Sequence, residues 1–340
     1  MTNSNKEYSF PQKVWIVGGI LTLIVVLLLL LKATFNVLLL VLAAALIAVF
    51  FRGLSGFIEQ KTKWNSNWSL AFSIIVTLLI VILLFWMMGA KVQAQAEELS
   101  KTLPVTIEKA KAELGKSAIG QKIIEKISSP ETKKQGESII QTFFKSTFGI
   151  LGDLYVVLFI GIFFTVAPKI YVDGIVTIVP AKGKAKAREV LQKTGDNLKK
   201  WLKGKLFAML VVFILTSAGL VIMGIPMWLV LALIAGILNF IPNFGPLIAM
   251  IPAVLVGLMK SPADALWVAG LYILVQVLES NFITPLVQQR LISVPPAAII
   301  IAQLLMAPLT GGWGLVLATP LLVIILVLVQ ELYVKKQRPS

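Results

Sequence analysis

Long uncharged runs of apolar residues alternate with charged segments along the first half of the chain. A helix that crosses the roughly 30 Å hydrocarbon core of a bilayer needs about 20 apolar residues. Runs of that size cover Val14–Leu31, Ala33–Phe51, Ser69–Ala90 and Thr147–Ala167. Only Lys32 separates the first two, so we expect a hairpin of two spans there. The pattern predicts an all-α, polytopic membrane protein.

Proline and glycine interrupt two even longer uncharged runs in the second half. Leu206–Met259 contains no charge but carries prolines at positions 226, 242, 246 and 252. Leu291–Gln330 is also uncharged and contains Pro308 followed by a glycine cluster at 311, 312 and 314. We expect about eight spans in all. The breaks fit re-entrant hairpins and kinked full spans equally well.

Two charged segments predict the topology. Residues 91–145 contain 10 Lys and 7 Glu with apolar residues at helical spacing, and residues 169–205 contain 10 basic and three acidic residues. The two segments carry ten basic residues each, but the second is shorter and its positive charges crowd the span that follows, so the positive-inside rule places it in the cytoplasm. We therefore expect a cytoplasmic tail (1–13), three spans (14–90), an extracytoplasmic amphipathic helical insertion (91–146), one span (147–167), cytoplasmic basic interfacial helices (168–205), a transport core (206–334) and a cytoplasmic tail (335–340).

Composition narrows the function. The chain is 58% hydrophobic and 14% charged, with a mean hydropathy of +0.90. It has no Cys and no His, which removes thiolate nucleophiles, the usual neutral-pH base and the commonest metal ligand. The net charge of +15 fits loops beside anionic lipid better than a nucleic-acid partner. We expect no enzyme activity, no cofactor and no metal.

The interrupted helices are the strongest candidates for a transport pathway. Broken helices persist at membrane depth only inside protein or beside a water-filled cavity, and matching breaks in two segments point to a binding site. Asn239–Pro246 and Ala307–Gly314 are such segments, although ordinary surface loops would read similarly. Glu279 follows Gln276 at the end of an apolar run, where a carboxylate either lines a pathway or marks the helix end.

The C-terminal half resembles the autoinducer-2 exporter family of bacterial membrane proteins. The resemblance rests on a series of short motifs, in order and spacing, across about residues 201–332. They are Gly204-Lys205-Leu206, Gly224-Ile225-Pro226, Ile241-Pro242-Asn243-Phe244-Gly245-Pro246, Gln276, Glu279, Asn281, Thr284-Pro285 and Thr319-Pro320-Leu321. The resemblance implies a multi-pass protein of the bacterial inner membrane, with about eight spans. It also implies a homo-oligomer that exports a small polar signal molecule or exchanges sodium for protons.

Together these observations predict a transporter that exports a small polar solute similar to autoinducer-2, with both termini in the cytoplasm. Sodium/proton antiport is the alternative, and a non-transporting membrane scaffold is a further one. The lipid bilayer and either the solute or Na⁺ and H⁺ are the expected partners. The expected pathway residues are Asn239, Pro242, Asn243, Gly245, Pro246, Gln276, Glu279, Asn281, Pro285, Gly311, Gly312 and Gly314.

Overall fold

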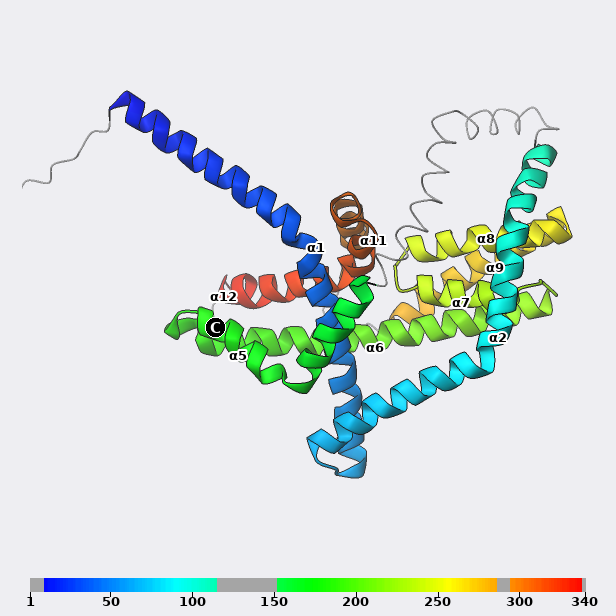
Figure 1. The fold of residues 1–340 in the computed structure, drawn as a ribbon, viewed down its shortest axis with the longest axis horizontal. Helices are drawn as coiled ribbons and strands as arrows, with labels where there is room; N and C mark the ends of the chain where they lie inside the picture. Colours follow the sequence, from blue (N-terminus) through cyan, green and yellow to red (C-terminus); the bar gives the residue numbers. More distant parts are fainter. Residues whose placement is uncertain (1–8, 115–151, 286–293, 338–340) are drawn as a thin grey trace, which may run out of the picture.

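A computed structural model describes residues 9–114, 152–285 and 294–337, and all regular structure in these ranges is helical. Figure 1 shows the arrangement, with α6 running through the middle of the molecule. The helices are α1 (Phe10–Thr62), α2 (Ser66–Leu114), one at Gly152–Val166, α5 (Pro168–Ile178), α6 (Lys184–Ile222), α7 (Trp228–Leu238), α8 (Phe244–Lys260), α9 (Pro262–Leu278), α11 (Pro296–Val329) and α12 (Lys335–Gln337).

The predicted polytopic architecture is confirmed. Within the described ranges, six helical stretches are long and apolar enough to cross a bilayer, or up to seven if the bent pair Gly152–Val166 and α5 counts as one span. Two of the six, Phe10–Leu27 and Thr34–Thr62, lie within the single helix α1. Two shorter apolar helices, α7 and α8, join them. Large apolar side chains are exposed over much of the surface; Trp86, for example, is 80% exposed. Such a surface is stable only against hydrocarbon or another apolar partner.

The expected hairpin at Lys32 is wrong. One continuous helix, α1, runs from Phe10 through Lys32 to Thr62, and it ends at Lys63 in a left-handed conformation (φ 58°). Lysine is a good helix former. A single lysine between two apolar runs therefore interrupts the hydropathy without ending the helix.

Two further expected boundaries lie inside helices. α2 continues past Ala90 to Leu114, and α6 joins the basic segment to the apolar run that begins at Leu206. A sharp boundary does occur before α5, which meets the helix Gly152–Val166 at 88°. Arg52 stabilises this bend, because its Nε donates to Thr165 O at 2.7 Å and its Nη2 to Val166 O at 2.9 Å. The membrane side of each segment stays a prediction.

Helix α6 contributes to two separate apolar cores. Val212 and Leu220 pack with α7, α8 and α9, together with Leu99 of α2. Nearer the N-terminal end of α6, Leu198 and Leu202 pack with α1, the helix Gly152–Val166 and α11. The stretch of α6 between these two cores faces a cavity, and that cavity is the candidate functional site.

Candidate functional site

A tight turn between α7 and α8 forms one side of the site. With 11 residues, α7 is about 16 Å long, too short to cross a bilayer. Asn243 takes a left-handed φ of 65° in the turn. A Cβ on Gly245 would lie only 1.8 Å from the carbonyl oxygen of Leu238, so the two backbones approach as only glycine allows. The α7–α8 pair thus forms a helical hairpin around this turn.

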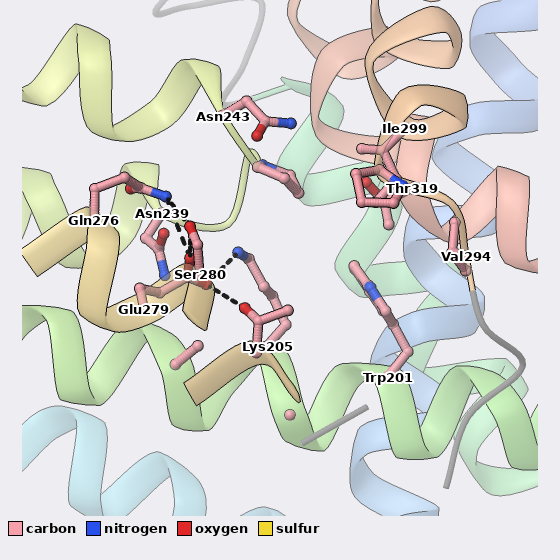
Figure 2. Close-up of a pocket in the computed structure, with 15 residues that line it drawn as sticks. Trp201, Lys205, Asn239, Asn243, Gln276, Glu279, Ser280, Val294, Ile299 and Thr319 are labelled. Carbon is pink, nitrogen blue, oxygen red and sulfur yellow. Dashed lines mark hydrogen bonds and ion pairs between the residues drawn. The ribbon is translucent and has the colours of Figure 1, made fainter. Parts of the chain in front are cut away.

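A cavity of about 190 Å³ lies between this hairpin, α6, α9 and α11. Figure 2 shows that its two walls differ in character. One wall is polar and carries Lys205, Asn239, Gln276, Glu279 and Ser280. The opposite wall is mainly apolar and carries Trp201, Val294 and Ile299, with Thr319 among them.

A buried ion pair lies at the polar wall. Lys205 Nζ of α6 is 3.9 Å from Glu279 Oε1, and the two side chains are only 10% and 8% exposed. Glu279 also accepts hydrogen bonds from Thr284 Oγ1 at 2.9 Å, Gln276 Nε2 at 3.3 Å and Ser280 Oγ at 3.4 Å. A carboxylate in an apolar interior requires such compensation.

Glu279 also opens a single π-helical turn, Glu279–Ile283, that follows α9. π-Helical turns inside longer helices occur mostly at functional sites. The wider turn places Glu279 and Thr284, five residues apart, within hydrogen-bonding distance. The π-helical turn therefore helps to form the polar cluster around Glu279.

Two buried polar atoms on the cavity walls have no hydrogen-bond partner among the described residues. They are Asn239 Nδ2 and Thr319 Oγ1, on residues that are 1% and 3% exposed. An unpaired buried polar group costs about 1–3 kcal/mol. A polar solute in the cavity would offset this cost.

Side chains from outside the hairpin hold it in place. Gln303 of α11 donates from Nε2 to the Pro242 carbonyl at 2.9 Å. At the other end of α7, the N-cap residue Met227 supplies no side-chain hydrogen bond. Gln95 of α2 takes that role, because its Oε1 accepts from the amides of Leu229 at 3.1 Å and Val230 at 3.3 Å.

The structure brings five of the predicted pathway residues together at this cavity: Asn239, Pro242, Asn243, Gln276 and Glu279. The others do not line it. Gly245 and Pro246 lie in the first turn of α8, where Gly245 packs on the α7 backbone. Asn281 and Pro285 are exposed, and Asn281 Nδ2 donates to the Val277 carbonyl.

The second predicted break is a kink inside α11. Gly311 adopts φ 62° and ψ −136° there, and a Cβ on Gly311 or Gly312 would meet nothing within 4 Å. Gly314 packs against the Met306 carbonyl. None of the three lines the cavity. The kink is instead linked to the helix Gly152–Val166, because Trp313 Nε1 donates to Asp153 Oδ2 at 2.7 Å.

The sequence did not identify Lys205 as a site residue. It closes a basic segment, and its carboxylate partner is 74 positions away. Helical spacing was the available indication, because Trp201, Lys205 and Ala208 recur at the i, i+4, i+7 positions of one helix face. The other candidate partner of Glu279 in the sequence is Arg290, for which a place at the membrane edge is the favoured interpretation, and it lies outside the described residues.

Comparison with known proteins agrees with this architecture. The profile of the family described as "AI-2E family transporter" matches residues 20–334. "Putative transport protein YueF" of Bacillus subtilis (strain 168) is 32% identical over 150 residues, which cover 44% of this chain and 41% of the relative. "Putative permease PerM" of Escherichia coli (strain K12) is 25% identical over 194 residues, 56% of this chain and 55% of the relative. These matches span about half or less of each relative's length.

Proposed function

This chain belongs to the AI-2E transporter family, and we propose that it exports a small polar solute through the cavity beside the α7–α8 hairpin. Members of this family are multi-pass membrane transporters and not enzymes. The observation that carries the proposal is the buried Lys205–Glu279 pair, which meets the unpaired amide of Asn239 at a helix break. The family's namesake signal, autoinducer-2, is the first solute to test.

The cavity walls support a solute with hydrogen-bonding groups on one face. Lys205 and Asn239 offer donors, and the carboxylate of Glu279 offers acceptors. Trp201 and Ile299 present apolar surface to the other face of the solute. The volume of about 190 Å³ equals roughly six water molecules' share of liquid water, at about 30 Å³ each. A solute of that size with several hydroxyl groups fits this arrangement.

Sodium/proton antiport is the second candidate, and the geometry of the ion pair supports it. The separation of 3.9 Å between Lys205 Nζ and Glu279 Oε1 exceeds hydrogen-bonding distance, so the two groups attract each other without a direct hydrogen bond. A sodium ion or a proton could compete with Lys205 for the carboxylate. Export and antiport would then use the same residue. Membership of a transporter family does not support the third alternative, a non-transporting membrane scaffold.

The remaining predictions belong to the same proposal. We place the protein in the bacterial inner membrane with both termini in the cytoplasm, on the basis of the basic segment at residues 168–205. Residues 91–146 would then lie on the outer side. We also propose a homo-oligomer, because the window Phe10–Leu27 of α1 is apolar and 0% buried within a single chain. The solute path would continue past the cavity toward Gly245, Pro246, Asn281 and Pro285. Gly311, Gly312 and Gly314, which the sequence also predicted to line it, do not line the cavity, and the proposed path leaves them out.

Flux through proteoliposomes tests the site. We expect Glu279→Gln and Lys205→Gln each to lower the flux of the transported solute at least tenfold, while the protein still inserts and melts cooperatively. The probes are autoinducer-2, a panel of small polyols, and radioactive sodium with a pH-sensitive dye in the lumen. Polyol efflux without a sodium requirement supports export, whereas sodium movement coupled to a pH change supports antiport.

Glu331→Gln is the matched control, because Glu331 is a buried, paired carboxylate that lies outside the cavity. Glu331 is 7% exposed, and it forms ion pairs with Lys186 at 2.9 Å and Lys193 at 3.0 Å. It should transport like the parent protein. Unchanged flux in both Glu279→Gln and Lys205→Gln would refute the site assignment.

A further inference from the structure

Two adjoining apolar cavities lie where α1 crosses α6 (Figure 1), on a different face of α6 from the solute cavity. The first has a volume of about 300 Å³ and the second about 440 Å³. They share the side chains of Phe50, Leu202 and Leu206, and the two adjoining cavities together are called the groove. The second cavity is lined by apolar residues only, including Leu154 and Phe240.

The first cavity differs from the second by its positive charge. Lys199 and Lys203 line it, and at i, i+4 spacing they lie on the same face of α6. Neither lysine forms an ion pair with any residue that the structure describes. Gly53 of α1 leaves room for the Lys199 stem, because a Cβ there would lie 3.0 Å from Lys199 Cε. Two neighbouring like charges beside an apolar groove repel each other unless an anion lies between them.

This combination specifies the chemistry of an occupant. The lysine end, with Lys199 half-buried and Lys203 exposed, favours an anionic group, and the rest of the groove favours a hydrocarbon chain. We propose that the groove binds an anionic phospholipid, with its phosphate between Lys199 and Lys203 and one acyl chain along Phe50, Leu202 and Leu206. A lipid without net charge lacks the free anion, and a second copy of this chain lacks the acyl chain.

The acyl chain would also contact the transport hairpin. Phe240 lies in the turn after α7 and lines the second cavity, whereas Trp201 lines the solute cavity. Their rings are 5.6 Å apart in an edge-to-face arrangement. This aromatic pair therefore separates the groove from the solute cavity. A bound lipid would pack against the hairpin without entering the solute path.

Native mass spectrometry of the whole protein tests the site. The protein is reconstituted with phosphatidylglycerol or with phosphatidylcholine and then exchanged into detergent. We expect one phosphatidylglycerol per chain to be retained, and the double variant Lys199→Gln/Lys203→Gln to retain it about tenfold less. Lys182→Gln/Lys184→Gln is the matched control, because it removes the same charge from exposed lysines at the N-terminal end of α6, where Lys184 is about 22 Å along the helix from Lys199, and should retain the lipid.

A second variant leaves the charges in place. Leu206→Trp adds volume at the junction of the two cavities and should also reduce retention about tenfold. The proposal is overturned if the parent protein retains both lipids equally, or if the control loses as much lipid as the test variant. It is also overturned if Phe57→Cys, at the lysine end of the groove, cross-links two copies through a disulfide in high yield, because a second copy would then fill the groove.

Discussion

The two interrupted helices, which one rule predicted together, differ in what surrounds them. The break at Asn239–Asn243 begins at a fully buried residue, Asn239, and side chains from α6, α9 and α11 meet it at the solute cavity. The break at Gly311 lies in open surroundings and lines no part of that cavity. The first break lies near a pair of opposite charges, Lys205 and Glu279, whereas the second lies near the single carboxylate of Asp153, which accepts from Trp313. A broken helix thus becomes a binding site through the residues that other helices bring to it.

The backbone shows the same contrast. At the first break, Gly245 is required because another backbone approaches within a distance that no side chain allows. At the second break, Gly311 is required by its dihedral angles alone, since φ 62° with ψ −136° is a region that side chains rarely adopt. Glycine therefore serves close packing at one break and a change of direction at the other.

The largest expected effect is that of Gly245→Ala. Its Cβ would overlap the Leu238 carbonyl oxygen, and backbone atoms cannot move aside as a flexible side chain can. We expect a loss of about 3 kcal/mol in the free energy of unfolding, at the upper end of overpacking costs. Solute flux should fall with it. Melting temperature in detergent and flux in proteoliposomes are the measurements.

Gly312→Ala is the control for this substitution, because Gly312 is helical and a Cβ there meets nothing within 4 Å. It should leave both the melting temperature and the flux unchanged. Equal losses in Gly245→Ala and Gly312→Ala would mean that the two breaks do not differ in packing, and the comparison would fail.

The sequence predicted the helical, polytopic fold because apolar runs of membrane-spanning length are a local property of the chain. It failed where a single charge was taken as a boundary. Lys32 lies inside α1, and Lys205 lies inside α6. Hydropathy reports where a helix meets water or lipid, whereas the helix itself ends where backbone hydrogen bonding ends. The two boundaries need not coincide.

Five of the fifteen residues that line the cavity could be predicted, some of them for a similar reason. Asn239, Pro242 and Asn243 are consecutive or nearly so, and a proline-containing break in apolar sequence marks them. The partners Lys205, Thr319 and Gln303 come from other helices, at separations that no local pattern encodes. Their roles follow from tertiary packing, which one sequence without its structure does not reveal.

An intermediate effect is expected for Gln95→Leu. The substitution removes the oxygen that accepts hydrogen bonds from Leu229 and Val230, and leaves two amides at the start of α7 without a protein partner. At about 1 kcal/mol for each bond, the local opening of α7 should become about 2 kcal/mol easier. Hydrogen exchange followed by mass spectrometry should then show exchange in the peptide covering α7 more than tenfold faster.

Two controls separate the hydrogen bonds from general damage. Gln95→Glu keeps an acceptor oxygen at the same position and should exchange like the parent protein. Gln93→Leu makes the same chemical change at an exposed position nearby and should also have no effect. Unchanged exchange in Gln95→Leu would show that α2 does not hold the hairpin.

The smallest effect is expected at the second break, for Trp313→Phe. The substitution keeps an aromatic ring but removes the indole N–H that donates to Asp153 at 2.7 Å. Both residues are half-buried, so we expect a cost of about 1 kcal/mol in a thermal unfolding assay, below the range for fully buried bonds to charged groups. A double-mutant cycle with Asp153→Ala should give a coupling energy of similar size.

Flux should remain close to that of the parent protein, because Trp313 does not line the solute cavity. If Trp313→Phe stopped flux while the protein stayed folded, the kink at Gly311 would belong to the transport path, and the two breaks would be functionally alike despite their different surroundings.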